Sequence, residues 1–126
     1  MEKEKVIKKY LGSLEKGSYE EILKLFVPSA IINSPLYGKV TAEVFYEELF
    51  KDTSNSTITL FNIFTGTDNP LNSAGHFRYD WVMKDGTPVS FECVDVFYFS
   101  EDGLIKELSI IYDTFNTSRS AFENLR

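Results

Sequence analysis

Residues that could do acid–base chemistry gather on two stretches of the sequence. His76, Arg78 and Asp80 alternate with aromatic residues, and Asp95 stands among apolar residues further along. A carboxyl group in apolar surroundings is costly without a partner, so Asp95 is expected to need His76 or Arg78. Carboxyls held beside an arginine can give and take protons on a ligand. These residues therefore predict acid–base chemistry that needs neither a metal nor an organic cofactor.

A hairpin is predicted to bring the two stretches together. Asp85 and Gly86 are a strong signal for a two-residue loop, which would pair His76 with Asp95. Because side chains alternate along a strand, this register predicts one face composed of His76, Arg78, Asp80, Phe91, Cys93 and Asp95. The opposite face is then predicted to hold Phe77, Tyr79 and Trp81.

A second hairpin extends the predicted face. A two-residue loop at Asp102 and Gly103 would pair Ile110 with Asp95, so that Ile110 and Tyr112 join the same face. Two interpretations of this face remain open, a solvated polar sheet surface or the wall of a cavity. The apolar residues around Asp95 favour a cavity with apolar walls and a few convergent polar groups.

Helices are predicted for the first part of the chain. Apolar spacing indicates a helix over residues 3–15 that ends at Gly17. Ser18 and Glu21 form a capping box for a second helix that runs to Pro28. A short strand over 30–33 and a turn at Tyr37 and Gly38 follow. Thr41 is expected to cap a third helix, whose buried face is predicted to comprise Val44, Phe45, Leu49 and Phe50.

Strands are predicted for the second part of the chain. β-branched and aromatic residues dominate the ranges 56–66, 74–84, 88–100 and 104–114. A short helix is expected from Thr117. Helices followed by strands predict an α+β fold in which the helices pack on one face of a curved antiparallel sheet.

Composition narrows the class of protein. The 126 residues correspond to a single domain over 1–126, and the net charge of −6 argues against a nucleic-acid partner. One cysteine, Cys93, excludes internal disulfides, and the single His76 argues against a His-rich metal site. Charges fill the N-terminal segment and the sequence contains no membrane-spanning apolar run, which predicts a cytoplasmic protein with no membrane partner.

The order of these elements resembles the SnoaL-like families of the nuclear transport factor 2-like (cystatin-like) superfamily. The stretches that carry the resemblance are YLGSLEKGSYEEILKLFVPSAIINSP, LYGKVTAEVFYEEL and VDVFYFSEDGLIKELSIIYDT. The resemblance covers nearly the whole chain and implies a cone-shaped sheet wrapped around three N-terminal helices, with a pocket at the open end. It also implies a homodimer formed through the outer sheet face, which would suit Phe77, Tyr79 and Trp81.

Ketosteroid isomerases, one branch of the superfamily, match in part. Tyr10 and Asp95 look like that branch's oxyanion-binding pair. The position of its carboxylate base falls on Ser34 before Pro35, and a hydroxyl cannot shuttle a proton at neutral pH as a carboxylate does. Tyr10 also fits a plain core tyrosine, because its spacing from Leu14 is helical.

Limonene-epoxide hydrolases match in part as well. Arg78 and Asp80 look like the Arg-x-Asp of that branch, and Asn33 looks like its asparagine. Its water-holding tyrosine and second aspartate fall on Ile31 and Ile110. Asp95, opposite Ile110 in the predicted register, could supply the second carboxylate. The alternative is an ion pair that only neutralises polar groups.

The sequence thus predicts a pocket for a small, largely apolar molecule. The candidate catalytic residues are Asp95, Asp80 and Arg78, and the candidate substrate-binding residues are Asn33, His76, Tyr10 and Tyr112. One hypothesis is a cofactor-independent acid–base enzyme of the epoxide hydrolase or isomerase type, acting on an epoxide, a ketone or a related polyketide- or terpenoid-like compound. The alternative is a non-catalytic module that binds a ligand or another protein.

Overall fold

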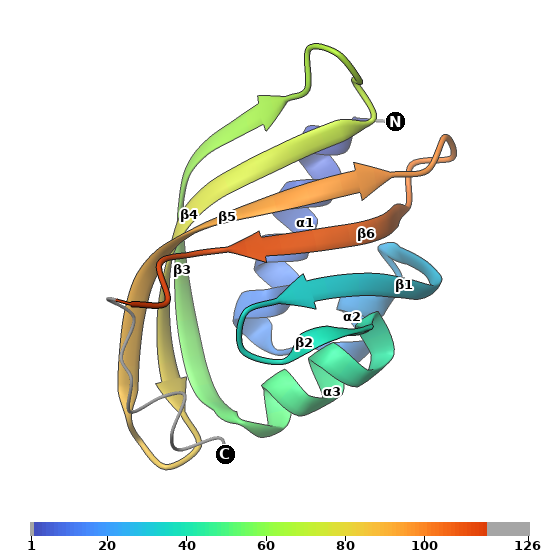
Figure 1. Cartoon of the computed structure of the whole chain (residues 1–126). Coiled ribbons are helices and arrows are strands. Elements are labelled where there is room, and N and C mark those ends of the chain that lie inside the picture. Colours follow the sequence, from blue (N-terminus) through green and yellow to red (C-terminus); the bar gives the residue numbers. More distant parts are fainter. Residues whose placement is uncertain (1, 116–126) are drawn as a thin grey trace.

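The computed structural model describes residues 2–115, which form a six-stranded curved sheet with three helices on its concave side (Figure 1). In chain order the elements are α1 (Lys3–Lys16), α2 (Tyr19–Leu23), β1 (Phe26–Ser34), β2 (Gly38–Thr41), α3 (Ala42–Lys51), β3 (Thr53–Thr65), β4 (Asn72–Met83), β5 (Pro88–Phe99) and β6 (Ile105–Ile111). The predicted α+β fold is confirmed. The helix expected from Thr117 lies outside the described residues.

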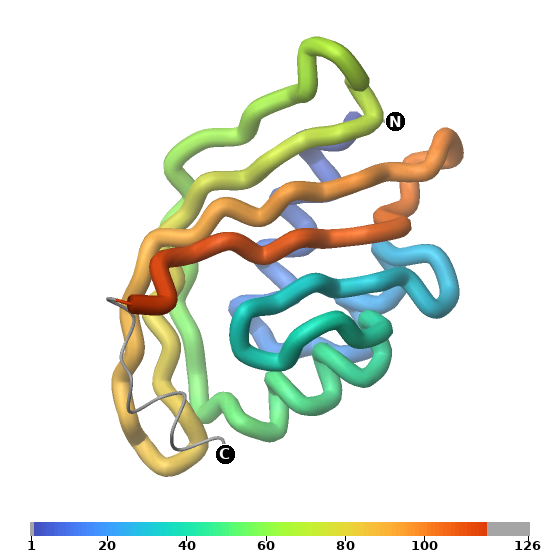
Figure 2. The backbone as a smooth tube through the Cα atoms, in the orientation of Figure 1, coloured from blue at the N-terminus to red at the C-terminus, as the bar shows by residue number. Residues whose placement is uncertain are grey.

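The sheet has the strand order β2-β1-β6-β5-β4-β3. Neighbouring strands are antiparallel except β1 and β6, which run parallel. The long strands β3, β4 and β5 bend strongly along their length, so that the sheet curls around α1 (Figure 2). This curvature creates a concave face on which an enclosed site can form.

Local signals start and stop the helices as expected. Gly17 ends α1 in the left-handed conformation with φ 70°, and the Ser18 hydroxyl accepts a hydrogen bond from the Glu21 N–H at 3.2 Å. The Thr41 hydroxyl caps α3 by accepting from the Val44 N–H at 3.3 Å. The end of α1 and the starts of α2 and α3 were therefore predictable from the sequence.

The second helix is shorter than predicted. It ends at Leu23, and Pro28 lies inside β1 instead of terminating the helix. Phe26 pairs with Ile105 of β6, and the Ile105 N–H donates to the Leu25 carbonyl at 2.9 Å. Pairing with a strand far along the chain therefore overrides the local helical preference of this segment.

The buried face of α3 also differs from the prediction. Phe45 and Leu49 are buried and Phe50 is half-buried, as expected, but Val44 is 48% exposed. Tyr46 takes its place in the core. The Tyr46 ring packs against Phe26 of β1 and Tyr10 of α1, with ring centroids 5.7 and 6.1 Å apart.

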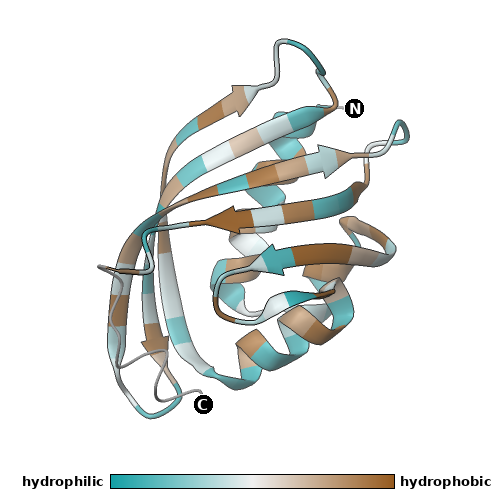
Figure 3. Cartoon of the chain, in the orientation of Figure 1, coloured by the Kyte–Doolittle hydropathy of each residue, from teal (hydrophilic) through white to brown (hydrophobic). Residues whose placement is uncertain are grey.

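The core fills the space between the helices and the concave face of the sheet. Apolar and polar residues alternate along the strands (Figure 3). From α1 the core receives Val6, Ile7, Tyr10, Leu11 and Leu14. From β4 and β5 it receives Phe77, Tyr79, Trp81, Met83, Val89, Cys93, Phe97 and Phe99. Among residues 2–115, no helix is long and apolar enough to cross a membrane.

Two glycines offer a matched test of the space that the structure leaves for a side chain at each position. At Gly12, inside α1, an added Cβ would meet nothing within 4 Å, so Gly12→Ala is expected to stabilise the protein by about 0.5–1 kcal/mol through helix propensity. At Gly66 the same atom would lie 2.6 Å from the Asn69 carbonyl oxygen, so Gly66→Ala is expected to destabilise. Urea unfolding of both variants checks the pair. Equal effects of the two substitutions would contradict this packing.

Candidate functional site

The β4–β5 hairpin has a different loop from the predicted one. The Met83 N–H donates to the Thr87 carbonyl and the Gly86 N–H donates to the Met83 carbonyl, each at 2.9 Å. These bonds close a three-residue loop over 84–86. Gly86 has φ 92°, whereas Asp85 does not have the positive φ that a two-residue type I′ loop requires. The chain therefore adopts a type I turn followed by a left-handed glycine.

One extra loop residue shifts the pairing of β4 with β5. His76 pairs with Val94, Arg78 with Glu92 and Asp80 with Ser90. Because side chains alternate, the shift moves the whole polar set of β4 to the face opposite Asp95. The prediction that His76, Arg78 and Asp80 share a face with Asp95 is wrong for this reason.

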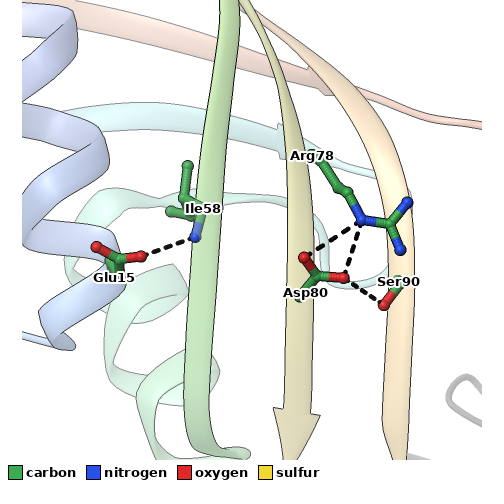
Figure 4. A network of polar contacts seen from close by, with 5 residues as sticks. All are labelled: Glu15, Ile58, Arg78, Asp80 and Ser90. Atoms are coloured by element: carbon green, nitrogen blue, oxygen red, sulfur yellow. Dashed lines mark hydrogen bonds and ion pairs between the residues drawn. The ribbon is translucent and has the colours of Figure 1, made fainter.

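The polar residues of β4 form a network on the convex face of the sheet. The Arg78 Nε donates to Asp80 Oδ1 at 3.0 Å, and the Ser90 hydroxyl donates to the same carboxylate at 2.7 Å. His76 Nε2 lies 3.0 Å from Glu92 Oε1. Figure 4 shows Arg78, Asp80 and Ser90 together over β4 and β5, away from Glu15 of α1. These groups therefore do not reach the concave side.

Asn33 is also on the convex face. Its side-chain amide donates to Glu107 Oε2 at 2.8 Å and to the Ser109 hydroxyl at 3.2 Å. Both partners lie on β6, which pairs with β1 beside Asn33. The residues carried over from limonene-epoxide hydrolases, Arg78, Asp80 and Asn33, are thus all separated from Asp95 by the sheet.

The β5–β6 hairpin keeps the predicted pairing near Asp95 by another route. The Ser100 N–H donates to the Leu104 carbonyl at 2.8 Å, which again closes a three-residue loop, with Gly103 at φ 89°. An irregularity between Tyr98 and Phe99 then restores the register. The pairing of Asp95 with Ile110 is confirmed.

A cavity of about 50 Å³ lies on the concave face, with Asp95 in its lining. Its buried wall comprises Tyr10, Leu14, Phe45, Leu49, Phe77, Tyr79, Trp81, Cys93 and Asp95. Its half-buried residues are Ser34, Leu36, Tyr37, Phe91, Ile110 and Tyr112. The half-buried set belongs to the β1–β2 turn and to the neighbouring ends of β5 and β6, so the cavity opens on that side. Room for roughly four water molecules is available.

Asp95 is the one charged residue that the described part of the chain contributes to this lining. It is 1% exposed, and the Cys93 thiol donates a hydrogen bond to its Oδ1 at 3.1 Å. Removal from water disfavours the carboxylate and raises the pKa of Asp95 to about 7, although the hydrogen bond from Cys93 opposes the shift. Near neutral pH both forms of Asp95 are therefore available.

Tyrosines bring most of the remaining polar atoms to the cavity. Tyr10 Oη and Tyr46 Oη form a hydrogen bond of 2.6 Å, and the Tyr37 hydroxyl donates to Asp52 at 2.7 Å. Burial raises the pKa of Tyr10, Tyr37 and Tyr112, so these phenols stay neutral. Tyr10 and Tyr112 thus line the cavity with Asp95, as the sequence predicted.

Several residues of the site were missed as site residues. The sequence predicts an outer dimer face for Tyr79 and Trp81, but they are buried in the cavity wall with Phe77. The aromatic surface patch that motivated the dimer is therefore absent, and the dimer stays a prediction of the resemblance alone. The sequence predicts the face of Cys93 correctly but indicates no role for this residue. Its spacing of two residues from Asp95 on one strand was the available signal.

A metal centre finds no support among residues 2–115, where no three potential side-chain ligands among His, Cys, Asp and Glu gather closely enough to hold an ion. Besides Asp95, the described residues bring to the cavity lining a thiol, a serine hydroxyl and tyrosine hydroxyls among aromatic and aliphatic side chains. Burial raises the pKa of the Cys93 thiol, which keeps it protonated and a poor metal ligand. The donors present suit a neutral organic group better than a cation.

Comparison with known proteins identifies the fold. No family model and no curated protein sequence matches the chain. Among solved structures, SalBIII, described as an epoxide hydrolase/cyclase-like enzyme in pyran-ring formation of the polyether salinomycin, superimposes with a TM-score of 0.78. The two chains are 18% identical over 92% of this chain and 94% of SalBIII.

Two further structures have the same architecture. A protein with a cystatin-like fold from Methylobium petroleophilum PM1 gives a TM-score of 0.73 at 18% identity, over 89% of this chain and 76% of that chain. A nuclear transport factor 2-like protein from Exiguobacterium sp. 255-15 gives 0.73 at 11% identity, over 86% and 98%. The chain therefore has the cystatin-like, nuclear transport factor 2-like fold that the sequence resemblance implied.

Proposed function

We propose that the concave cavity binds a small, largely apolar molecule through a single polar group, and that Asp95 is the residue that engages this group. The observation that carries the proposal is one fully buried carboxyl in an otherwise uncharged lining. A buried polar group without a full set of hydrogen-bond partners lowers the stability of the folded protein. A ligand that bonds to Asp95 would offset that cost.

The proton affinity of Asp95 suits acid–base chemistry. Its pKa, raised to about 7 by burial, lets it donate a proton near neutral pH and take one back afterwards. Donation to the oxygen of an epoxide or a ketone would assist ring opening or isomerisation. The structural likeness to SalBIII supports this class of substrate.

A catalytic carboxylate pair is not part of the proposal. Within residues 2–115 no second carboxyl lines the cavity, and Asp80 belongs to the convex network. Reactions that need one proton donor therefore fit better than hydrolysis, in which a second carboxylate would activate water. This consideration restricts the enzyme hypothesis to chemistry in which Asp95 acts alone.

A non-catalytic ligand-binding module is the second candidate, and the size of the cavity favours it. A volume of about 50 Å³ holds a fragment of few atoms, well below the size that drug-like ligands occupy. A pocket of this kind could retain a small apolar compound without converting it. The two candidates share the site and differ only in turnover.

Asp95→Asn tests the proposal, with Asp80→Asn as the matched control on the convex face. Small epoxides and cyclic ketones would be titrated against each protein, with fluorescence of Trp81, the single tryptophan and a cavity residue, as the signal. For an enzyme, Asp95→Asn is expected to abolish turnover while affinity stays within about tenfold. Asp80→Asn should behave as wild type.

Three other results decide between the candidates or against the proposal. Saturable binding without turnover in wild type would assign the chain to the binding modules. Turnover that persists in Asp95→Asn would remove Asp95 from the chemistry. A wild-type protein that binds none of the probes would contradict the proposed function as a whole.

A further inference from the structure

The Cys93 thiol forms a hydrogen bond with the Asp95 carboxyl in the cavity wall. Cys93 and Asp95 are two residues apart on β5, so both side chains point to the concave side, and both line the cavity. The thiol sulfur lies 3.1 Å from Asp95 Oδ1. No other side chain within residues 2–115 forms a hydrogen bond with this carboxyl, so Oδ2 is left for a ligand.

The direction of the Cys93–Asp95 hydrogen bond follows from the chemistry of the two groups. A thiol has one proton to donate, and sulfur is a weak acceptor. Burial raises the pKa of the Cys93 thiol and keeps it protonated, although the Ile111 backbone N–H opposes the shift. Cys93 is therefore the donor and Oδ1 the acceptor.

A protonated carboxyl that accepts at one oxygen must carry its proton on the other. Because Oδ1 accepts from Cys93, the neutral acid has its carbonyl character at Oδ1 and its O–H at Oδ2. Without the thiol the proton could occupy either oxygen. The thiol thus removes one of two arrangements and directs the O–H to the open side of the carboxyl.

We propose that Cys93 is a positioning residue that presents the Oδ2–H of Asp95 to the cavity, so that the site selects ligands bearing a hydrogen-bond-accepting oxygen, such as ketones, epoxides or ethers. The inference rests on the proposed function and names its ligand class. An alcohol would bring an O–H of its own that needs a further acceptor in the cavity, and an ordinary amine would enter as a cation at this pH. An isosteric hydrocarbon would leave the buried O–H without a partner.

Cyclopentanone and methylenecyclopentane test the ligand class, because they share a shape and differ in C=O against C=CH₂. Binding would be followed by Trp81 fluorescence at about pH 5.5, where Asp95 keeps its proton. Wild type is expected to favour the ketone by about fivefold or more, the gain from one hydrogen bond. Equal affinities would overturn the proposed ligand class.

Cys93→Ala and Cys93→Ser then test the positioning role. Alanine removes the donor and lets the Asp95 proton occupy either oxygen, so the ratio of the ketone affinity to the hydrocarbon affinity should fall by about twofold. Serine restores an O–H and should recover the preference. If Cys93→Ala retains the full preference, the thiol has no positioning role.

Infrared spectroscopy of wild type provides a test that needs neither a ligand nor a variant at position 93. Cys93 is the single cysteine, so the protein has one S–H stretching band. The frequency of that band should shift with pH as Asp95 loses its proton. In Asp95→Asn the frequency should not depend on pH. A band at the free-thiol position that ignores pH would overturn the proposal. If neither probe binds wild type, the proposed function and the ligand class fail together, while this band still decides the role of Cys93.

Discussion

Raising the pH from about 5 to about 7 is expected to cost wild type about 2 kcal/mol of stability relative to Asp95→Asn, because Asp95 keeps its proton in the folded protein up to about pH 7. An unfolded aspartic acid has already lost that proton above about pH 4. Between these values the folded state binds more protons than the unfolded state, so stability falls as pH rises. The contribution is complete below the unfolded pKa and is lost through the folded pKa.

Asparagine has the shape of a protonated aspartic acid and cannot ionise. The free energy of unfolding of Asp95→Asn therefore does not fall with pH in this way. The measurement is the free energy of unfolding in urea at several pH values for wild type and Asp95→Asn. Asp80→Asn serves as the control, because it makes the same chemical change in the exposed convex network. A difference between wild type and Asp95→Asn that stays constant with pH would show that Asp95 ionises as an ordinary carboxyl.

Phe77→Ala is expected to destabilise the protein by about 3–5 kcal/mol, whereas Arg78→Ala should cost less than about 1 kcal/mol. Phe77 is 2% exposed on the concave face, and the next side chain, that of Arg78, is 47% exposed on the convex face. Removing the ring leaves a void between the sheet and the helices, whereas removing Arg78 breaks only a solvated ion pair.

The comparison of these two neighbours tests the strand register directly. In the register expected from a two-residue hairpin loop, Phe77 would lie on the outer face and the order of the two effects would be reversed. Chemical denaturation of both variants under one set of conditions is sufficient. Loss of stability confined to Arg78→Ala would contradict the three-residue loop over 84–86.

Most helices and strands were predictable because their signals are local, but the early end of α2 and the strand β2 were not. Ser18 and Thr41 start helices with their own side chains, and Gly17 ends one with its backbone conformation. Alternation within one strand is equally local. The sequence therefore predicted that Asp95 shares its face with Cys93, since two residues on a strand suffice to establish it.

The pairing of one strand with another depends on residues far apart in the chain. The predicted register of β4 against β5 was wrong for that reason. Asp85 and Gly86 fit both a two-residue loop with two positive φ angles and a three-residue loop in which only the glycine has one. The two loops differ by one residue, which reverses the faces of the whole partner strand. Nothing in the dipeptide itself decides between them.

Packing of the entire chain decided the register. The three-residue loop turns Phe77, Tyr79 and Trp81 toward the helices and leaves Arg78 and Asp80 in water. Burial of large aromatic rings is worth several kcal/mol, far more than the preference between loop types. The amino-acid sequence by itself thus determined most of the helices and strands and which residues flank Asp95 on β5. Only the tertiary structure decided which side chains stand opposite Asp95 across the cavity, because that choice depends on the burial energy of both strands together.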